Sequence, residues 1–276
     1  MVDSSIEGRV AIVTGAASPI GLGRAMSLAL VRAGARVAMV DVDRASLDRS
    51  VADARAIGGA DCALAVVGDV TRPEDAERVV RETLRAMGGL HILLNNAGIN
   101  PVIRGQEPGP LFGQIPIEDW TRTVAVNVNG PFFMARAAVR HLVAQGWGRI
   151  IGVTTSLDTM IRAAPYGPSK AAHEALMAVI AREVEGTGVT ANVLIPGGAT
   201  RTNMTRDRWA DTMLDPEVMQ APAVWLASGN SDGVNGRRII AELWDEELPI
   251  AERLAKAAAP IAWPQLGRAG AAARPS

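Results

Sequence analysis

The chain has 276 residues, of which 48% are hydrophobic and 21% charged, so a full-sized buried core is expected and intrinsic disorder is excluded. Its formal net charge is −1 and it has no basic stripe, which argues against a nucleic-acid partner. No apolar run approaches the roughly 20 residues that a membrane-spanning helix needs, which argues against a membrane protein.

Short apolar runs rich in valine and isoleucine alternate with longer amphipathic stretches. The expected strands are residues 9–15, 35–43, 62–70, 91–98, 148–156 and 189–198. The expected helices follow the first strand up to residue 33 and then cover residues 44–57, 72–87, about 117–145 and about 167–185. Near-continuous apolar strands are typical of a parallel sheet that is covered on both faces. The alternation therefore predicts a Rossmann-type, doubly wound α/β fold with helices on both faces.

The chain shows no internal repeat and no interdomain linker, which predicts a single nucleotide-binding domain over residues 1–259. Two irregular stretches, about 99–116 and 197–215, are too long to be simple connectors and are expected to form substrate loops. Residues 260–276 are rich in Ala, Pro, Gly and Arg and are expected to form a loose or oligomer-dependent tail.

The single cysteine, Cys62, rules out an internal disulfide and indicates a reducing compartment. It lies in an apolar run and is expected to be a core residue. The N-terminus lacks the basic and apolar regions of a signal peptide. A cytoplasmic protein is expected.

A glycine-rich turn, with Gly15, Gly21 and Gly23, joins the first strand to its helix. Glycines at this place let the backbone approach a pyrophosphate, which then lies at the helix N-terminus. The second strand ends at Asp41, where a carboxylate can accept both hydroxyls of an adenosine ribose and repels a 2′-phosphate. NAD is therefore favoured over NADP, although the neighbouring Asp43 and Arg44 leave the exact ligand open.

Tyr166 is the only tyrosine of the chain, and Lys170 follows it four residues later. Side chains at this spacing share one face of a helix. An unperturbed phenol has a pKa near 10, and a neighbouring ammonium is expected to lower it. Such a pair can exchange a proton with an alcohol or a carbonyl compound during hydride transfer.

Seven short motifs occur in an order that resembles the short-chain dehydrogenase/reductase family over about residues 8–242. These are TGAASPIGLG, GDV at 68–70, NNAG at 95–98, NVNG at 127–130, TTS at 154–156, YGPSK at 166–170 and PGG at 196–198. The resemblance implies that Tyr166 is the general acid/base and that Lys170 holds the nicotinamide ribose and lowers the tyrosine pKa. It also implies that Ser156 binds the substrate oxygen and that Asn127 holds a water of a proton relay.

The resemblance further implies a set of cofactor contacts. Asp69 and Val70 would contact the adenine, and the segment after the fourth strand would line the cofactor. The implied cofactor-binding residues are Gly15, Ser18, Gly21, Leu22, Asp41, Asp69, Val70, Asn96, Ala97, Gly98, Tyr166, Lys170, Pro196, Gly197 and Thr202.

The sequence departs from the family pattern in three places. Five residues separate Gly15 from Gly21, so Pro19-Ile20 is interpreted as an extension of the phosphate turn, with the phosphate donors left open. Ser156 lies ten positions before Tyr166, closer than usual, which predicts a tight intervening loop. Arg201 occupies a position where family patterns commonly carry a threonine, so the choice between its neighbours Thr200 and Thr202 also stays open.

The three histidines, His91, His141 and His173, have no metal-ligand spacing, and no metal is expected. The leading hypothesis is an NAD-dependent secondary-alcohol dehydrogenase or carbonyl reductase acting on a small molecule. The alternatives are an NADP-dependent 3-oxoacyl-type reductase, against which Asp41 argues, and a catalytically silent cofactor-binding sensor, against which the complete Asn–Ser–Tyr–Lys set argues.

The substrate and the direction of the reaction stay open. Residues 199–214 are interpreted as a lid with an apolar cover of Met204, Trp209 and Met213. Four arginines on loops, most of them expected to be solvated, are candidates for a substrate carboxylate: Arg104, Arg162, Arg206 and Arg208. The resemblance also implies a homotetramer or homodimer with an interface formed by the helices expected at about 117–145 and 167–185.

Overall fold

A computed structural model describes residues 6–101, 110–162, 164–208 and 211–263, apart from the side chains of residues 206–208. Eight strands form one sheet in the order β3-β2-β1-β4-β5-β6-β7-β8. All neighbours pair in parallel except β7 and β8, which are antiparallel. The strands are β1 (Val10–Thr14), β2 (Arg36–Asp41), β3 (Ala63–Val67), β4 (Ile92–Asn95), β5 (Gly148–Val153), β6 (Val189–Ile195), β7 (Arg237–Ile240) and β8 (Ala258–Pro260).

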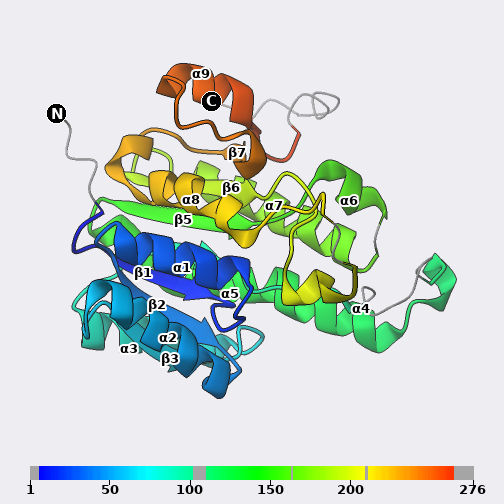
Figure 1. Ribbon diagram of the computed structural model, residues 1–276, viewed down its shortest axis with the longest axis horizontal. Helices are drawn as coiled ribbons and strands as arrows, with labels where there is room; N and C mark the ends of the chain where they lie inside the picture. Colours follow the sequence, from blue (N-terminus) through cyan, green and yellow to red (C-terminus); the bar gives the residue numbers. More distant parts are fainter. Residues whose placement is uncertain (1–5, 102–109, 163, 209–210, 264–276) are drawn as a thin grey trace, which may run out of the picture.

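Helices cover both faces of this sheet (Figure 1). The α-helices are α1 (Leu22–Arg32), α2 (Arg44–Gly58), α3 (Pro73–Met87), α4 (Ile117–Val124), α5 (Gly130–Ala144), α6 (Leu157–Arg162), α7 (Tyr166–Glu183), α8 (Gln220–Ala227) and α9 (Ile250–Ala257). Shorter 3₁₀ turns are η2 (Phe112–Gln114), η4 (Asn203–Arg208), η5 (Pro216–Met219), η6 (Gly229–Ser231) and η7 (Ala241–Leu243). The predicted doubly wound α/β fold is confirmed.

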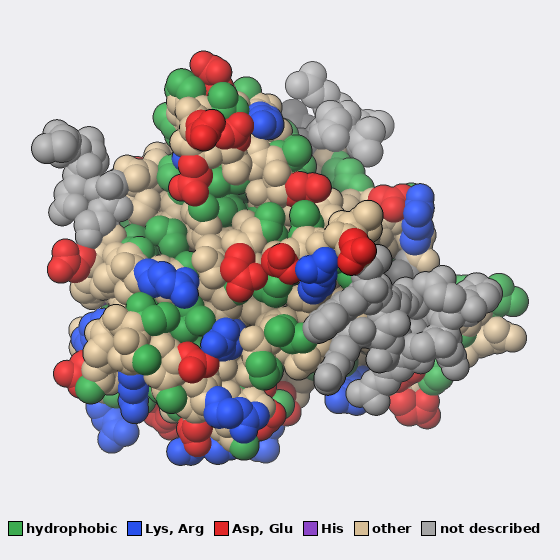
Figure 2. All heavy atoms as spheres, viewed as in Figure 1, with side chains coloured by type: hydrophobic (Ala, Val, Ile, Leu, Met, Phe, Trp, Pro, Cys, Tyr) green, Lys and Arg blue, Asp and Glu red, His purple; other side chains and the backbone are tan. Residues whose placement is uncertain are grey.

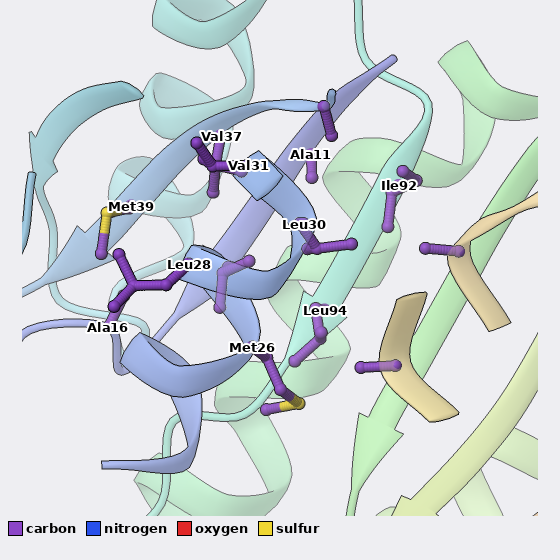
Figure 3. Packing of buried hydrophobic residues seen from close by; sticks show 14 of the residues in the cluster. Ala11, Ala16, Met26, Leu28, Leu30, Val31, Val37, Met39, Ile92 and Leu94 are labelled. Atoms are coloured by element: carbon purple, nitrogen blue, oxygen red, sulfur yellow. The ribbon is translucent and has the colours of Figure 1, made fainter. Parts of the chain in front are cut away.

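The strands are buried on both faces, as their apolar composition requires. Ala11 and Val13 of β1 belong to the core cluster beneath α1, α2 and α8, whereas Val10 and Ile12 belong to the cluster beneath α3, α5 and α7. Figure 3 shows part of the first cluster, in which side chains of α1 lie against β4. Cys62 is buried in the same cluster, as predicted.

Two predicted elements differ in detail from the structure. The helix expected at about 117–145 consists of α4 and α5 joined by a π-helical turn, Ala125–Asn129. Between Ser156 and Tyr166, where a tight loop was expected, residues Leu157–Arg162 form the short helix α6.

The start of the expected tail packs against the sheet. Ala258–Pro260 form β8, and Ile261 is buried in the core cluster beneath α7. The remainder, residues 264–276, lies outside the described residues. In the described ranges, none of the helices combines the length and apolar character that a bilayer crossing requires.

The surface carries charges of both signs. Figure 2 shows acidic and basic side chains mixed over the α2–α3 side of the visible face. Several of them form ion pairs, for example Arg24 with Asp53 and Arg44 with Asp48.

The strand order reverses between β1 and β4, which lie side by side in the middle of the sheet. In open α/β sheets, ligands bind beyond the carboxyl ends of the strands at such a reversal. This topology places the turn after β1, the segment after β4 and the segment after β5 around one opening.

Candidate active site

A cavity of about 630 Å³ lies at this edge of the sheet. Six parts of the described chain contribute to its lining: the turn after β1, Asp41 at the end of β2, residues 96–100 after β4, residues 153–159 at the end of β5 and beyond, the start of α7, and residues 196–205 after β6. A volume of this size is in the range of cofactor and small-molecule sites, roughly 300–1,000 Å³.

The glycine-rich turn is held by close backbone contacts. Gly15 has φ +67°, and a Cβ there would lie 2.8 Å from the Cα of Ala97. A Cβ at Gly23 would overlap the carbonyl oxygen of Gly15. Gly21 donates its N–H to the backbone carbonyl oxygen of Ser18 and is the N-cap of α1. The residues of the predicted extension, Pro19-Ile20, therefore form a turn before the helix.

This turn fits a dinucleotide phosphate. Gly15, Ser18, Gly21 and Leu22 all line the cavity. The Ser18 hydroxyl is buried and has no hydrogen-bond partner among the described residues. A buried donor without a partner is costly, and a phosphate oxygen would satisfy it at the N-terminus of α1.

Asp41 ends β2 and lines the same cavity. Its Oδ2 accepts from the N–H of Ala17 at 3.1 Å, and its Oδ1 accepts from the N–H groups of Val42 at 2.8 Å and Asp43 at 3.2 Å. The carboxylate is therefore fixed beside the glycine-rich turn. Asp43 has a different task, because it caps α2 by accepting from the N–H of Ser46 at 3.1 Å.

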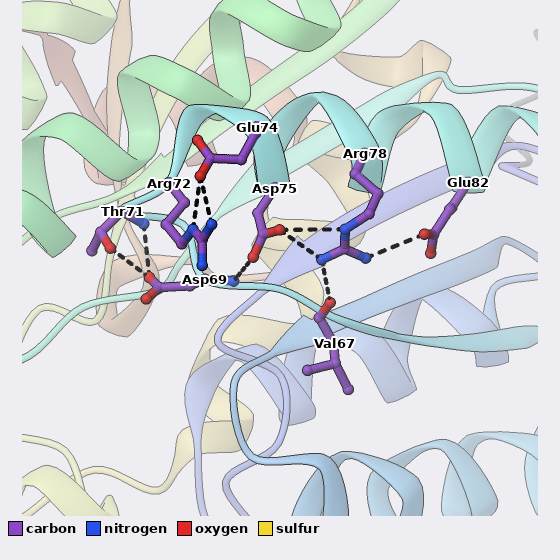
Figure 4. Close-up of polar contacts among 8 residues, drawn as sticks. All are labelled: Val67, Asp69, Thr71, Arg72, Glu74, Asp75, Arg78 and Glu82. Carbon is purple, nitrogen blue, oxygen red and sulfur yellow. Dashed lines mark hydrogen bonds and ion pairs between the residues drawn. The ribbon is translucent and has the colours of Figure 1, made fainter.

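Asp69 and Val70, predicted to contact adenine, are not among the described residues that line the cavity. Asp69 is part of a polar network at the start of α3 (Figure 4). Its Oδ1 accepts from the backbone N–H of Thr71 at 2.9 Å, and its own N–H donates to Asp75 at 2.9 Å. This network fixes the turn between β3 and α3, while Val70 packs against Gly130 at the start of α5.

The segment after β4 is tied to β1. Asn96 donates its side-chain amide to the carbonyl oxygens of Thr14 at 2.9 Å and Gly15 at 3.1 Å. Asn96, Ala97 and Gly98 all line the cavity. Asn96 thus has a structural role in addition to its predicted place beside the cofactor.

Tyr166 and Lys170 both line the cavity from the first turns of α7. Lys170 is 3% exposed and donates its ammonium to the carbonyl oxygen of Val153 at 2.9 Å. Its Nζ lies 5.8 Å from the centre of the Tyr166 ring.

Burial raises the pKa of Tyr166 to about 12 and lowers the pKa of Lys170 to about 8. The predicted lowering of the tyrosine pKa by its lysine neighbour is therefore wrong as it stands. The cause is the removal of the phenolate from water, which disfavours the charged form of the phenol.

Ser156 lines the cavity at the start of α6. Its hydroxyl lies 2.9 Å from the Thr159 hydroxyl and accepts from the Thr159 N–H at 3.2 Å. Thr159 also lines the cavity. The pair therefore places two hydroxyls in the lining of the cavity to which Tyr166 also belongs.

Asn127 is fully buried in the π-helical turn and is not among the described lining residues. Its side chain exchanges two hydrogen bonds with the backbone of Ile99, at 2.9 and 3.0 Å, and donates to the hydroxyl of Ser169 at 2.9 Å. Asn127 therefore joins the segment after β4 to α7, whereas its predicted relay water stays a prediction.

Pro196, Gly197, Thr200 and Thr202, which follow β6, also line the cavity. Because both threonines line the cavity, the choice between them stays open. Of the predicted apolar cover, Met204 lines the cavity, Met213 is not among the described lining residues, and Trp209 lies outside the described residues.

The candidate carboxylate-binding arginines are not brought together by the described structure. Arg162 is exposed and pairs with Asp158 at 2.8 Å. Arg104 lies outside the described residues, as do the side chains of Arg206 and Arg208.

Two residues close to the site are not found by sequence reasoning. Glu174, four residues after Lys170 on α7, is fully buried, and Arg238 of β7 pairs with it at 2.5 Å. The sequence does offer one indication of this buried pair: Arg238 lies inside an apolar strand, and Glu174 lies on the face of α7 that carries Lys170.

The comparisons with known proteins agree with this architecture. The sequence matches the family described as short chain dehydrogenase over residues 9–213. It is 33% identical over 251 residues to the galactitol 2-dehydrogenase (L-tagatose-forming) of Cereibacter sphaeroides, covering 84% of this chain and 92% of that protein. It is 30% identical over 255 residues to the L-rhamnose 1-dehydrogenase (NAD(P)(+)) of Sphingomonas sp. (strain SKA58), covering 86% and 96%.

A solved structure, a short-chain type dehydrogenase/reductase from Mycobacterium marinum, has a TM-score of 0.76 and 29% identity, covering 86% of this chain and 94% of that one. The chain therefore belongs to the short-chain dehydrogenase/reductase family, as its motifs predict. It is an oxidoreductase of a family that uses NAD(P) and acts on small molecules.

Proposed function

We propose that the protein interconverts a secondary alcohol and its ketone, on a small molecule, with NAD(H). One observation carries the proposal: a single cavity joins the glycine-rich turn and Asp41 to Ser156, Tyr166 and Lys170. A hydride-transfer enzyme needs both parts in one space, since the cofactor must reach from its phosphates to the reacting carbon.

In the oxidation direction, the alcohol oxygen is held by the hydroxyls of Ser156 and Tyr166. Tyr166 takes the hydroxyl proton as the C–O double bond forms, and in reduction it returns that proton to the ketone oxygen. A bound nicotinamide would supply the hydride acceptor or donor. The Lys170 ammonium, together with the positive charge that an oxidised nicotinamide would add, favours the phenolate and opposes the burial that raises the pKa of Tyr166 to about 12.

The preference for NAD rests on Asp41. Its carboxylate lines the cavity and is fixed by three backbone N–H groups. A fixed negative charge there suits the free ribose hydroxyls of NAD and repels the 2′-phosphate of NADP. Arg44, a possible partner for that phosphate, is instead paired with Asp48 at 2.8 Å.

We also propose that the chain assembles into a homo-oligomer through α5 and α7. Phe132 and Val143 on α5 and Val179 on α7 are 45%, 38% and 52% exposed. Burial of exposed apolar side chains of this kind would favour association. Sedimentation equilibrium with Val179→Asp tests this, since a wild-type protein that sediments as a monomer would contradict it.

The test of the activity is to incubate purified protein with NAD⁺ or NADP⁺ and a panel of secondary alcohols that includes polyols and sugars, and to follow the reduced cofactor. Tyr166→Phe removes the proton acceptor and is expected to lower turnover by about 10²- to 10⁴-fold. NADH binding, followed by fluorescence titration, is expected to survive in the variant.

Turnover with NAD⁺ that Tyr166→Phe abolishes would support the proposal. A preference for NADP⁺ would contradict the role given to Asp41 and favour the 3-oxoacyl-type reductase. NADH binding without turnover of any compound would favour the sensor.

A further inference from the structure

The segment that carries Ser156 is attached to α7 at two points. Lys170 donates to the carbonyl oxygen of Val153 at 2.9 Å. One turn further along α7, Glu174 accepts from the hydroxyl of Thr154 at 3.2 Å. Both attachments lie within three residues of Ser156.

Arg238 of β7 connects Glu174 to the next residue of that segment. Its Nε and Nη2 donate to the two carboxylate oxygens of Glu174 at 3.0 and 2.5 Å. Its Nη1 and Nη2 also donate to the carbonyl oxygen of Thr155 at 3.0 and 3.1 Å. Thr155 directly precedes Ser156, so the guanidinium holds the backbone from which the Ser156 side chain extends.

The pair is deeply buried and has several hydrogen-bond partners. The side chains of Glu174 and Arg238 are 0% and 7% exposed. Glu174 accepts a further hydrogen bond from the N–H of Ala262 at 3.2 Å. A buried ion pair is often no more stabilising than apolar side chains of similar volume, so a gain in stability does not by itself account for this pair.

We infer that Glu174 and Arg238 are positioning residues that set the place of the Ser156 hydroxyl relative to Tyr166. Glu174 and Tyr166 belong to one rigid helix, and the Glu174–Arg238 pair ties that helix to the carbonyl oxygen beside Ser156. The inference rests on the proposed function, since it gives Ser156 and Tyr166 a shared substrate oxygen. Neither Glu174 nor Arg238 is among the described residues that line the cavity.

The first variant is Arg238→Lys, which keeps the positive charge but cannot bind Glu174 and Thr155 together. Displacement of a positioned group by about 1 Å can reduce catalysis by about 100-fold, so we expect kcat to fall by about 10- to 100-fold. The Kd of NADH is expected to stay within about twofold of wild type, because the cofactor end of the cavity is untouched.

Arg149→Lys is the matched control. Arg149 is a second buried arginine, 1% exposed, at the opposite end of β5, where it binds Asp232 and the carbonyl oxygen of Ser228. Its replacement is expected to lower the melting temperature while leaving kcat within about twofold of wild type, since distant sites act independently.

The double variant Glu174→Met/Arg238→Met separates positioning from stability. Apolar replacement of both partners is often neutral or stabilising, so the melting temperature is expected near that of wild type while kcat stays low. Recovery of kcat together with the melting temperature would overturn the inference, because the pair would then be merely structural.

Amide hydrogen exchange of residues 154–162 gives a readout that does not need turnover. We expect exchange there to be about tenfold faster or more in Arg238→Lys and unchanged in Arg149→Lys, as local opening is set by local contacts. Wild-type exchange rates in Arg238→Lys would overturn the inference. Absence of turnover in the wild type would defeat the proposed function instead, and the exchange result would still decide whether the pair holds this segment.

Discussion

The two ends of the cavity are held in place by different means. At the glycine-rich turn, backbone packs against backbone, and a Cβ at Gly15 would lie 2.8 Å from the Cα of Ala97. At α7, buried polar side chains hold the wall, as where Lys170 binds the carbonyl oxygen of Val153 at 2.9 Å. Substitutions of the glycines at the first end should therefore act through steric room, whereas substitutions at the second end, and of the hydrogen-bonded Asp41 beside the turn, should act through charge and hydrogen bonding. Four experiments test this difference.

The largest expected effect is that of Gly23→Ala at the cofactor end. The new Cβ would overlap the carbonyl oxygen of Gly15, and backbone cannot move aside as a flexible side chain can. We expect the free energy of unfolding to fall by about 3 kcal/mol or more, measured by urea denaturation. Gly113→Ala is the control, because a Cβ at Gly113 meets no atom within 4 Å. Equal urea midpoints for Gly23→Ala and the wild type would contradict the steric account.

The next effect is a pH dependence that comes from Lys170. The folded-state pKa of about 8 lies below the ordinary 10.5, so the unfolded chain binds more protons between these values. The free energy of unfolding of the wild type should therefore increase as the pH rises from 8 to 10. This gain should be lost again as the pH falls back through 8.

The measurement compares the unfolding free energies of the wild type and Lys170→Met over this pH range. Relative to the variant, the wild type should gain about 2 to 3 kcal/mol, at 1.36 kcal/mol per pKa unit. The raised pKa of Tyr166 acts in the opposite sense, but only above pH 10. If the unfolding free energies of the two proteins changed equally with pH, burial would not lower the pKa of Lys170.

A smaller effect is expected for cofactor choice. Asp41→Ser removes the charge that repels a 2′-phosphate and should shift the ratio of kcat/KM for NAD⁺ over NADP⁺ by about 10- to 100-fold toward NADP⁺. Asp43→Ala is the control, because it removes an equal charge two residues away. Its direct effect is the loss of the side chain that caps the N-terminus of α2. It should lower the melting temperature slightly, because the α2 cap is lost, and leave the ratio of kcat/KM for NAD⁺ over NADP⁺ unchanged. An equal shift in both variants would mean that general charge, not the Asp41 site, selects the cofactor.

The smallest effect is expected for Thr159→Val, which keeps the shape of the side chain but removes the hydroxyl that lies 2.9 Å from the Ser156 hydroxyl. A hydrogen bond of this kind contributes about 1 kcal/mol, so kcat should fall about fivefold. NADH affinity should not change. A change in NADH affinity with unchanged kcat would mean that the Thr159 hydroxyl acts on the cofactor and does not orient the Ser156 hydroxyl.

The fold and the family could be predicted from the sequence because both depend on patterns within short stretches of the chain. Near-continuous apolar strands predict a parallel sheet. The four-residue spacing of Tyr166 and Lys170 predicts that both side chains lie on one face of a helix. The sequence also predicts most residues of the cavity, since the ends of parallel strands meet at one edge of a sheet.

Contacts between residues far apart in the chain, and the burial of individual side chains, could not be predicted from such short patterns. Glu174 and Arg238 are 64 residues apart, and nothing local to either one indicates the other. The pKa of Tyr166 was predicted with the wrong direction because the spacing shows a neighbouring charge but not the loss of water around the phenol. Asp69 has the predicted position after β3, yet its bonds to Thr71 and Asp75 belong to a turn outside the cavity lining.

The short strand β8 has a consequence for solubility. It pairs with β7, which would otherwise present unpaired backbone N–H and C=O groups at the end of the sheet. Such groups invite strand addition from another chain, and β8 limits this risk because it is only three residues long and ends at Pro260, which has no N–H to offer. The strand therefore covers β7 with an edge that is itself poorly suited to further strand addition.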